Sequence, residues 1–285
     1  VVMLPIPEPE TRTEALKSGD VDVVFVMQHQ SAPGIEANDG TKVVQSASAS
    51  YLNLSMDTKR APFDNILVRK AMQAATDREA ISQAALFGNG VIANDHPIPP
   101  NDPHFAPQYA PPPYDIELAK SLLAEAGYPD GIDVTLYTST VGPGLVDMAV
   151  VMKEKAAPAG IRIDIQQKPE DAFWVDYWIV EPFSTVFWNG RPPDQALSIT
   201  TASDSQWNAA HYDNPVIDEL IVKARGQDLA GRRETYGEIQ RILVDEVPRI
   251  IAVFQPVLYG ARDEVYGIPA HPLGWQILTD AWLDR

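Results

Sequence analysis

The 285-residue sequence predicts an α/β protein with a mixed β-sheet. Residues 132–138, 144–157 and 161–166 show the pattern of a strand, a helix and a second strand. Such a crossover favours a parallel, right-handed pair of strands. Strand-like residues return at 249–267, where Pro256 marks an edge or a bend. Strands interleaved with helices therefore indicate the α/β class.

The first elements predicted along the chain are a short helix and two strands. The helix at residues 10–20 is expected to end at Gly19, in a left-handed cap position. Residues 21–27 are apolar and β-branched, which is typical of a buried strand. In the next strand, within 42–57, Tyr51 and Asn53 are two residues apart and should point to the same face.

Two helices are predicted within residues 64–88, with Asp64 capping the first, Asp77 capping the second and Gly88 ending the pair. The segment 88–113 contains eight prolines, so it is expected to form a long ordered surface loop.

Further helices are predicted by apolar residues at three- and four-residue spacing. The remaining expected elements are helices at 114–128 (capped by Asp115 and ended by Gly127), 169–179, 214–227 and 231–247, and a strand at 184–188.

Composition excludes several classes of partner and chemistry. The net charge is −17, so phosphate backbones and anionic membrane surfaces would be repelled. There are no cysteines, which excludes disulfides and thiolate catalysis. Residues 1–10 lack the basic start and apolar stretch of a signal peptide, and no apolar run is long enough for a membrane-spanning helix.

The stretch 187–195, "FWNGRPPDQ", carries the candidate ligand-binding residues Trp188, Asn189, Arg191 and Asp194. An indole can stack on a ring, and a guanidinium presents a planar fork of donors to an anion. The alternative for Arg191 is an ordinary ion pair with Asp194, in a surface turn.

Other aromatic residues favour packing over binding. Trp174, Tyr177 and Trp178 have helical spacing and are expected to pack between helix and sheet. Trp207 and Asn208 lie in a polar, turn-rich segment that we expect to fasten the following helix.

Neither a metal site nor a catalytic motif is predicted. The five histidines do not have metal-ligand spacing, and no cofactor is expected. The sequence contains no G-x-S-x-G, H-E-x-x-H, P-loop or G-x-G-x-x-G motif. Paired acidic residues leave a carbohydrate-active hydrolase as the alternative function.

Five stretches together resemble the extracellular solute-binding proteins of family 5, the dipeptide, oligopeptide and nickel group that serves ABC importers. The chain resembles only the C-terminal portion of such a protein. The stretches are "TRTEALKSGDVDVV", "YLNLSMDTKRAPFDNILVRKAMQAATDREAI", "YDIELAKSLLAEAGYPDG", "AGIRIDI" and "RRETYGEIQRILVDEVPRIIAVF".

The resemblance implies a periplasmic-binding-protein-like fold of type II, cluster C, in which two lobes close on a ligand without catalysis. Residues 1–58 and 248–285 would form part of a first lobe, and residues 59–247 the second lobe. Hinge crossings are then expected near 57–60 and 246–250.

The resemblance also bears on the ligand. In peptide-binding relatives an acidic residue after the tryptophan holds the ligand's amine, and the matching position here is Arg191. We therefore expect an anionic or polyhydroxyl solute, such as an opine, a sugar conjugate or an acidic peptide. Through the resemblance alone, Tyr51 and Asn53 join the candidate ligand-binding residues.

The implied partners are the ligand and the membrane permease subunits of an ABC importer, and the implied location is the periplasm or the outer face of the membrane. Nucleic acid is not an expected partner. If a first lobe lacks half of its sheet, its exposed strand edges favour self-association of the chain.

Overall fold

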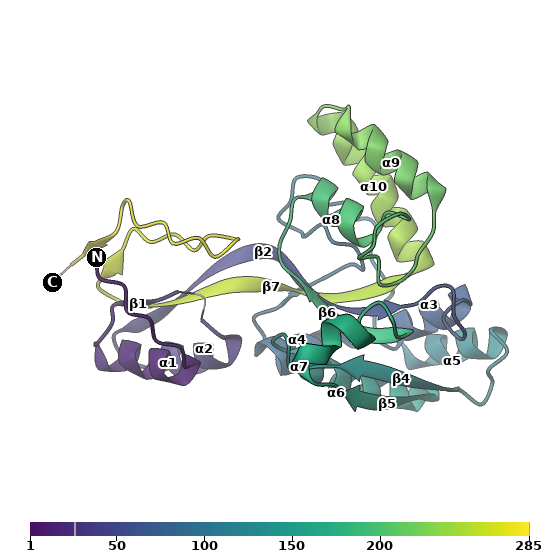
Figure 1. Ribbon diagram of the computed structural model, residues 1–285, viewed down its shortest axis with the longest axis horizontal. Coiled ribbons are helices and arrows are strands. Elements are labelled where there is room, and N and C mark those ends of the chain that lie inside the picture. The colour runs from purple at the N-terminus through teal and green to yellow at the C-terminus, as the bar shows by residue number, and fades with distance from the viewer. Residues whose placement is uncertain (26, 285) are drawn as a thin grey trace. The chain divides into compact units, whose positions relative to one another are not determined.

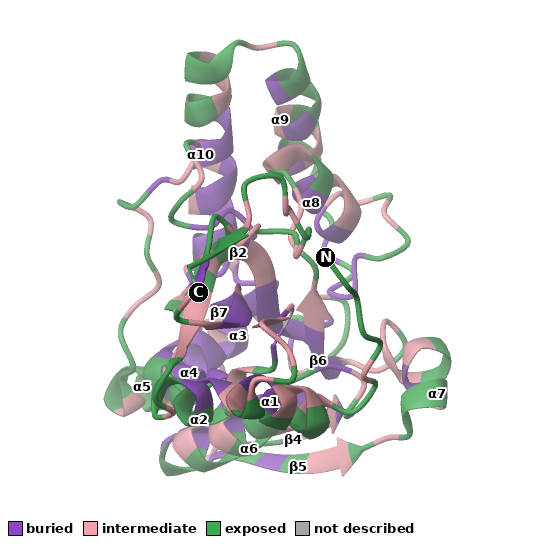
Figure 2. Cartoon of the chain, turned by 90° about the vertical axis from the view of Figure 1, so that its left-hand side faces the viewer, coloured by how far each residue is buried: buried purple, intermediate pink, exposed green. Residues whose placement is uncertain are grey.

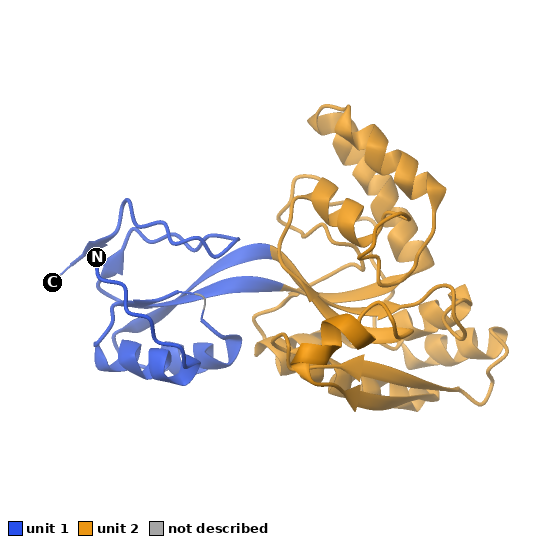
Figure 3. Ribbon diagram, in the orientation of Figure 1, with its two compact units in different colours: residues 1–48, 255–285 blue, residues 49–254 orange. Residues whose placement is uncertain are grey.

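The computed structural model describes residues 1–25 and 27–284, and these form two compact units (Figure 3). Unit 1 comprises Val1–Ser48 and Gln255–Arg285, and unit 2 comprises Ala49–Phe254. The predicted lobe boundaries, near 57–60 and 246–250, fall inside unit 2. The assignment of the units to two closing lobes stays a prediction.

Unit 1 packs short helices and strand segments around a small apolar core of Leu16, Val24, Met27, Ile35 and Leu258. Its own elements are α1 (Pro9–Ser18), β1 (Val23–Val24), a 3₁₀ turn (His29–Ser31), α2 (Ala32–Glu36), β8 (Val265–Tyr266) and β9 (Trp282–Leu283).

Helix α1 ends as predicted, with Gly19 in the left-handed conformation at a φ of 84°. Strand β1 is shorter than the strand predicted over 21–27, because Val21 and Met27 leave the ladder. Residue 26 of that predicted strand lies outside the described residues.

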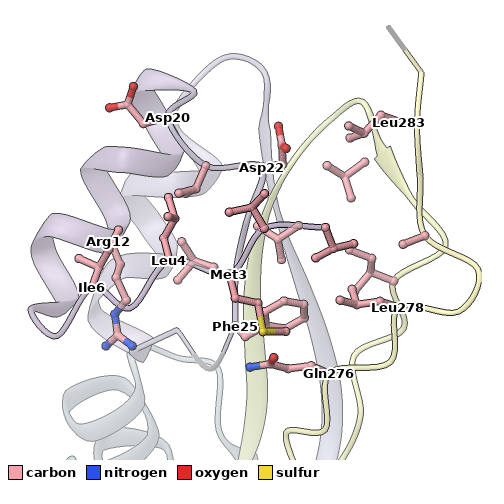
Figure 4. A pocket seen from close by; sticks show the side chains of 18 of the residues that line it. Met3, Leu4, Ile6, Arg12, Asp20, Asp22, Phe25, Gln276, Leu278 and Leu283 are labelled. Atoms are coloured by element: carbon pink, nitrogen blue, oxygen red, sulfur yellow. The ribbon is translucent and has the colours of Figure 1, made fainter.

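A largely apolar pocket of about 910 Å³ lies within unit 1 (Figure 4). Its wall includes Leu4, Ile6, Phe25 and Leu278 beside a few polar groups such as Gln276. Several apolar side chains around it are strongly exposed: Val1, Val2, Met3, Leu4, Trp282 and Leu283.

Unit 2 contains most of the regular structure. Its elements are α3 (Ile66–Ala74), α4 (Arg78–Leu86), β3 (Val91–Ile92), α5 (Ile116–Glu125), β4 (Ile132–Thr138), α6 (Leu145–Ala156), a 3₁₀ turn (Ala157–Ala159), β5 (Ile161–Gln167), α7 (Glu170–Ala172), a π-helical turn (Phe173–Tyr177), β6 (Phe183–Trp188), α8 (Pro193–Thr200), α9 (Pro215–Arg225) and α10 (Leu229–Glu246). Strands β2 (Thr41–Met56) and β7 (Arg249–Arg262) have residues in both units.

The sheet of unit 2 is mixed, as predicted. Its strands lie in the order β7-β2-β6-β4-β5, and β3 pairs with β7. Strands β4 and β5 are parallel, with Ile132 opposite Ile161, so the parallel pair predicted from their order is confirmed. Strand β6 is parallel to β4 but antiparallel to β2.

Helices cover this sheet from two sides (Figures 1 and 2). Helices α4, α5 and α6 lie on one side, where Leu52, Leu54 and Leu136 join the largest apolar core. Helices α8, α9 and α10 lie on the opposite side and pack around a second core that contains Ile217 and Ile239. The residues between these two cores are where a polar site can form.

Helix caps explain where the helices of unit 2 begin. The Asp77 and Asp115 carboxylates accept from Ala80 N and Leu118 N, which confirms both predicted caps. The prediction for Asp64 is wrong: the neighbouring Asn65 caps α3 by accepting from Leu67 N at 2.9 Å. Both residue types are good caps, and the packing of α3 decides between them.

Other elements also differ from the prediction. The helix predicted over 169–179 is α7 followed by the π-helical turn. Residues 88–113 form a loop, but Val91 and Ile92 pair with β7 as the short strand β3. The two prolines after Arg191 lead into helix α8, which was not predicted, with Pro193 at the first helical position. Proline suits that position because its missing amide hydrogen would have no partner in the helix.

Buried His96 provides a test of the packing in unit 2. Its side chain is fully buried beside the Phe105 ring, and burial lowers the pKa of His96 to about 3. In the unfolded chain the pKa is near 6.5, so the unfolded state binds the proton first as pH falls. The contribution of neutral, buried His96 to the free energy of unfolding is therefore complete above pH 6.5 and is lost progressively toward pH 3.

We predict that His96→Asn makes the protein less sensitive to acid. Between pH 6.5 and 4.5, urea denaturation should show a fall in unfolding free energy that is smaller than in the wild type by about 2–3 kcal/mol. The variant's lower stability from altered packing applies at both pH values and cancels in this comparison. Equal falls in the two proteins would contradict the buried neutral state of His96.

Candidate functional site

The candidate site begins with the pairing of β2 and β6. Tyr51 lies opposite Trp188 in the antiparallel ladder, and Asn53 lies opposite Val186. Tyr51 and Asn53 are nearly fully buried, yet they lie on the face away from Leu52 and the large apolar core. Alternation along β2 therefore separates the core side chains from the polar ones.

The Tyr51 hydroxyl is buried and has no hydrogen-bond partner. Thr200 of α8 and the guanidinium of Arg249 lie beside it without completing a well-aligned hydrogen bond. Burial raises the pKa of Tyr51, and the positive charges of Arg249 and Arg191 oppose that rise. A neutral phenol among two cations is thus available to donate or to accept.

Arg249, at the start of β7, is the main residue that the sequence analysis missed. Its side chain is 3% exposed, one terminal nitrogen donates to the Thr200 carbonyl, and Nε has no partner. Burial lowers the pKa of Arg249, and the groups that oppose this are the tyrosines Tyr51 and Tyr212. The only sequence signal was a charged residue just before a strongly apolar strand.

Asn53 supplies a further buried polar group. Its Nδ2 donates to Ser55 Oγ at 3.0 Å, but its Oδ1 has no partner. Unpartnered buried polar atoms are rare in folded proteins. The hydroxyl of Tyr51, Oδ1 of Asn53 and Nε of Arg249 together offer both donors and an acceptor, a combination suited to a polar ligand.

Aromatic rings surround Trp188. The centroids of Trp178 and Trp207 lie 5.9 and 6.5 Å from that of Trp188. Trp174 contacts both Trp178 and Phe187, so the predicted packing role of the aromatic run agrees with these contacts. Trp188 itself is half-buried and can present an apolar surface to a ligand.

Arg191 stacks on Trp188. Its guanidinium carbon is 5.2 Å from the Trp188 ring centroid, and Nη1 donates to the Asn189 carbonyl at 2.9 Å. The alternative ion pair with Asp194 is not formed, because Asp194 accepts from Arg225 Nε at 2.9 Å. The structure thus brings together Arg191, Trp188 and Tyr51, and it turns Asp194 toward α9.

Asn208 holds the loop between α8 and α9; its hydrogen bonds go to residues before α9 and not to the helix that it was expected to fasten. Its Nδ2 donates to the carbonyls of Thr201, Ala202 and Tyr212. Trp207 is 42% exposed and reaches Trp188 through its ring. The two neighbours therefore differ, since Asn208 fixes the loop and Trp207 extends the aromatic cluster.

Residues 1–25 and 27–284 contain no group of three or more side chains that could hold a metal ion. Among the helices of the same residues, none is long and apolar enough to cross a membrane.

The sequence and the fold match a family of binding proteins. Residues 1–209 match the profile described as Bacterial extracellular solute-binding proteins, family 5 Middle. The glutathione-binding protein GsiB of Salmonella choleraesuis is 30% identical over 267 residues, covering 89% of this chain and 52% of that protein. Heme-binding protein A of Haemophilus influenzae is 27% identical, covering 98% and 53%. The chain thus spans about half the length of the curated relatives it matches.

Solved structures agree. A dipeptide-binding protein from Pseudoalteromonas sp. SM9913 in complex with Met-Leu has a TM-score of 0.81 and 27% identity, covering 98% of this chain and 57% of that one. HbpA2 from Haemophilus parasuis has a TM-score of 0.84 at 22% identity, with the same coverage, and supports the fold alone. The chain belongs to the bacterial extracellular solute-binding proteins of family 5.

Proposed function

We propose that the protein is a substrate-binding component of an ABC importer, acting in the periplasm or at the outer face of the membrane. It captures a peptide-like, anionic or polyhydroxyl solute by lobe closure and delivers it unchanged to membrane permease subunits. The family match supports a binding role and gives no support to a carbohydrate-active hydrolase.

The observation that carries this proposal is the buried set of unpartnered polar atoms beside Trp188. Tyr51, Asn53 and Arg249 each keep a buried side-chain atom without a hydrogen-bond partner. A ligand that completed these bonds would remove the penalty of leaving them unsatisfied. Ligand pockets commonly combine apolar walls with a few placed polar groups.

Relatives with named ligands suggest the class of solute to test. The glutathione-binding protein GsiB and the Met-Leu complex both concern small peptides, whose carboxylates suit a guanidinium. We propose contacts to Tyr51, Asn53, Trp188, Asn189 and Arg191. Asp194 could contact a ligand only through a cationic group that displaced Arg225, its ion-pair partner.

We predict that the 285-residue chain binds at least one of Met-Leu, glutathione and gluconate with a Kd in the micromolar range or tighter, as measured by isothermal titration calorimetry. Trp188→Leu should weaken that binding about tenfold, because the stacking surface is lost. Trp282→Leu, which changes an exposed tryptophan of unit 1, is the matched control and should bind like the wild type.

Two results would count against the proposed function. One is a folded wild-type chain that binds none of the three probes. The other is saturable conversion of a probe into products, since a binding protein releases its ligand unchanged.

We also propose that the chain self-associates through unit 1. The exposed apolar residues around its pocket include Leu4, at 57% exposure, and Trp282, at 54%. Contiguous apolar surface of this kind tends to be covered by another chain.

We predict that sedimentation velocity shows larger species as the wild-type concentration rises. The double variant Leu4→Glu, Trp282→Glu should remain monomeric over the same range, because charge opposes burial of the surface. Val222→Glu, at an exposed apolar position on α9, is the control and should associate like the wild type. A wild-type chain that is monomeric at every concentration would rule out this association.

A further inference from the structure

Unit 2 contains three buried arginines, and two of them are well compensated. Arg78 Nη2 lies 2.8 and 2.7 Å from the two carboxylate oxygens of buried Asp95. Arg69 donates from Nε to the Glu246 carbonyl at 2.9 Å and from Nη1 to the Phe63 carbonyl at 2.7 Å. The Arg78 guanidinium thus meets two acceptor atoms, and that of Arg69 meets three, because Nη1 also donates to the Asp64 carbonyl at 3.4 Å.

Arg249 has fewer acceptors than either. One terminal nitrogen donates to the Thr200 carbonyl, and Nε, like that of Arg78, has no partner. Within the described part of the chain Arg69 also lacks an ion pair, but its charge is surrounded by backbone carbonyls. No ion pair within residues 1–25 and 27–284 includes Arg249. The chain therefore buries a full positive charge without an opposite charge in contact with it, although it has a large excess of acidic residues.

Such a charge destabilises a folded protein unless something pairs with it. Burial lowers the pKa of Arg249, and only tyrosines oppose that change. An arginine nevertheless stays protonated in proteins, so the positive charge persists. The missing partner is an anion with one charge and two acceptor atoms, which describes a carboxylate.

We propose that Arg249 is the specificity-determining residue of the site and selects ligands that carry a carboxylate. This inference rests on the proposed function. The carboxylate accepts from the Arg249 guanidinium and from the Tyr51 hydroxyl, whose buried atoms have no partner. A phosphate dianion would leave an excess buried negative charge opposite one arginine and is therefore the poorer fit.

Entry of the carboxylate requires movement of the Trp188–Arg191 pair. Tyr51 is 2% exposed, whereas Trp188 and Arg191 are half-buried, and the charge of Arg191 acts on the Tyr51 hydroxyl. Trp188 packs against the apolar cluster that contains Tyr51. The inference therefore includes displacement of Trp188 and Arg191 by the ligand, and Arg191 can then follow the ligand as a second cation.

The test compares two peptides that differ by one charge. Met-Leu and its C-terminal amide are titrated into the wild type, Arg249→Met, Arg249→Lys and Arg162→Met. We expect the wild type to prefer the acid over the amide at least tenfold, since hydrogen bonds to charged groups are strong. Arg249→Met should lose this preference, and Arg249→Lys should keep part of it without the fork. Arg162→Met removes an exposed arginine of β5 and should match the wild type.

A second measurement does not depend on the peptide. Sodium acetate is compared with sodium chloride at equal ionic strength, and the melting temperature is recorded. Acetate should raise the Tm of the wild type but not of Arg249→Met. Without added anion, Arg249→Met should melt at or above the wild-type temperature, because an unpaired buried charge has been removed.

The outcomes separate this inference from the proposed function. Equal wild-type affinity for Met-Leu and its amide overturns the role of Arg249 and leaves the binding function standing. A rise in Tm with acetate that persists in Arg249→Met likewise overturns the role of Arg249 and leaves the binding function standing. If Arg249→Met does not fold, the test depends on Arg249→Lys. If that variant prefers Met-Leu over its amide as strongly as the wild type does, the planar guanidinium of Arg249 is not needed and the inference is overturned. Absence of binding by every probe, acetate included, overturns both proposals.

Discussion

The antiparallel pairing of β2 with β6 is the constraint on which the site depends. Its register places Tyr51 opposite Trp188 and Leu52 opposite Phe187. Because side chains alternate along a strand, one face of this pair joins the apolar core and the other carries the polar groups. A shift by one residue would bury Leu52 on the polar side and turn Tyr51 into the core. The large apolar core therefore stabilises the register, and the register positions the site.

A second constraint acts where α10 meets β7. The helix ends at Val247, which is fully buried and left-handed, with a φ of 49°. A β-branched residue adopts this conformation only when its surroundings impose it. Pro248 follows, with a fixed φ and no amide hydrogen, and Arg249 then begins the strand. The turn thus stops the helix abruptly, and Arg249 in the strand that follows donates to the Thr200 carbonyl of α8.

Patterns of a few neighbouring residues correctly predicted the features that depend on short-range interactions. The caps Asp77 and Asp115, and the parallel pair β4 and β5, follow from hydrogen bonds and periodicity within a few residues. Helix α8 was not predicted, because two consecutive prolines predict only a stiffened backbone, although Pro193 begins the helix. Arg249 could not be found in this way. The groups around it come from distant parts of the sequence. The Thr200 carbonyl, 49 positions earlier, accepts its hydrogen bond, and Tyr51, which is further away still, lies beside it.

The overall charge means that the anion recognition we propose has to be local. A net charge of −17 disfavours the approach of any negatively charged solute at long range. Salt screens that repulsion beyond about 8 Å at physiological ionic strength, while buried charges are screened much less. A guanidinium held away from water therefore keeps its full attraction at the distance of a hydrogen bond. An exposed arginine would be weakened both by solvent and by the surrounding carboxylates, as Arg225 is by its exposed pairing with Asp194. Burial of Arg249 would thus allow an acidic protein to hold the acidic ligand that we propose.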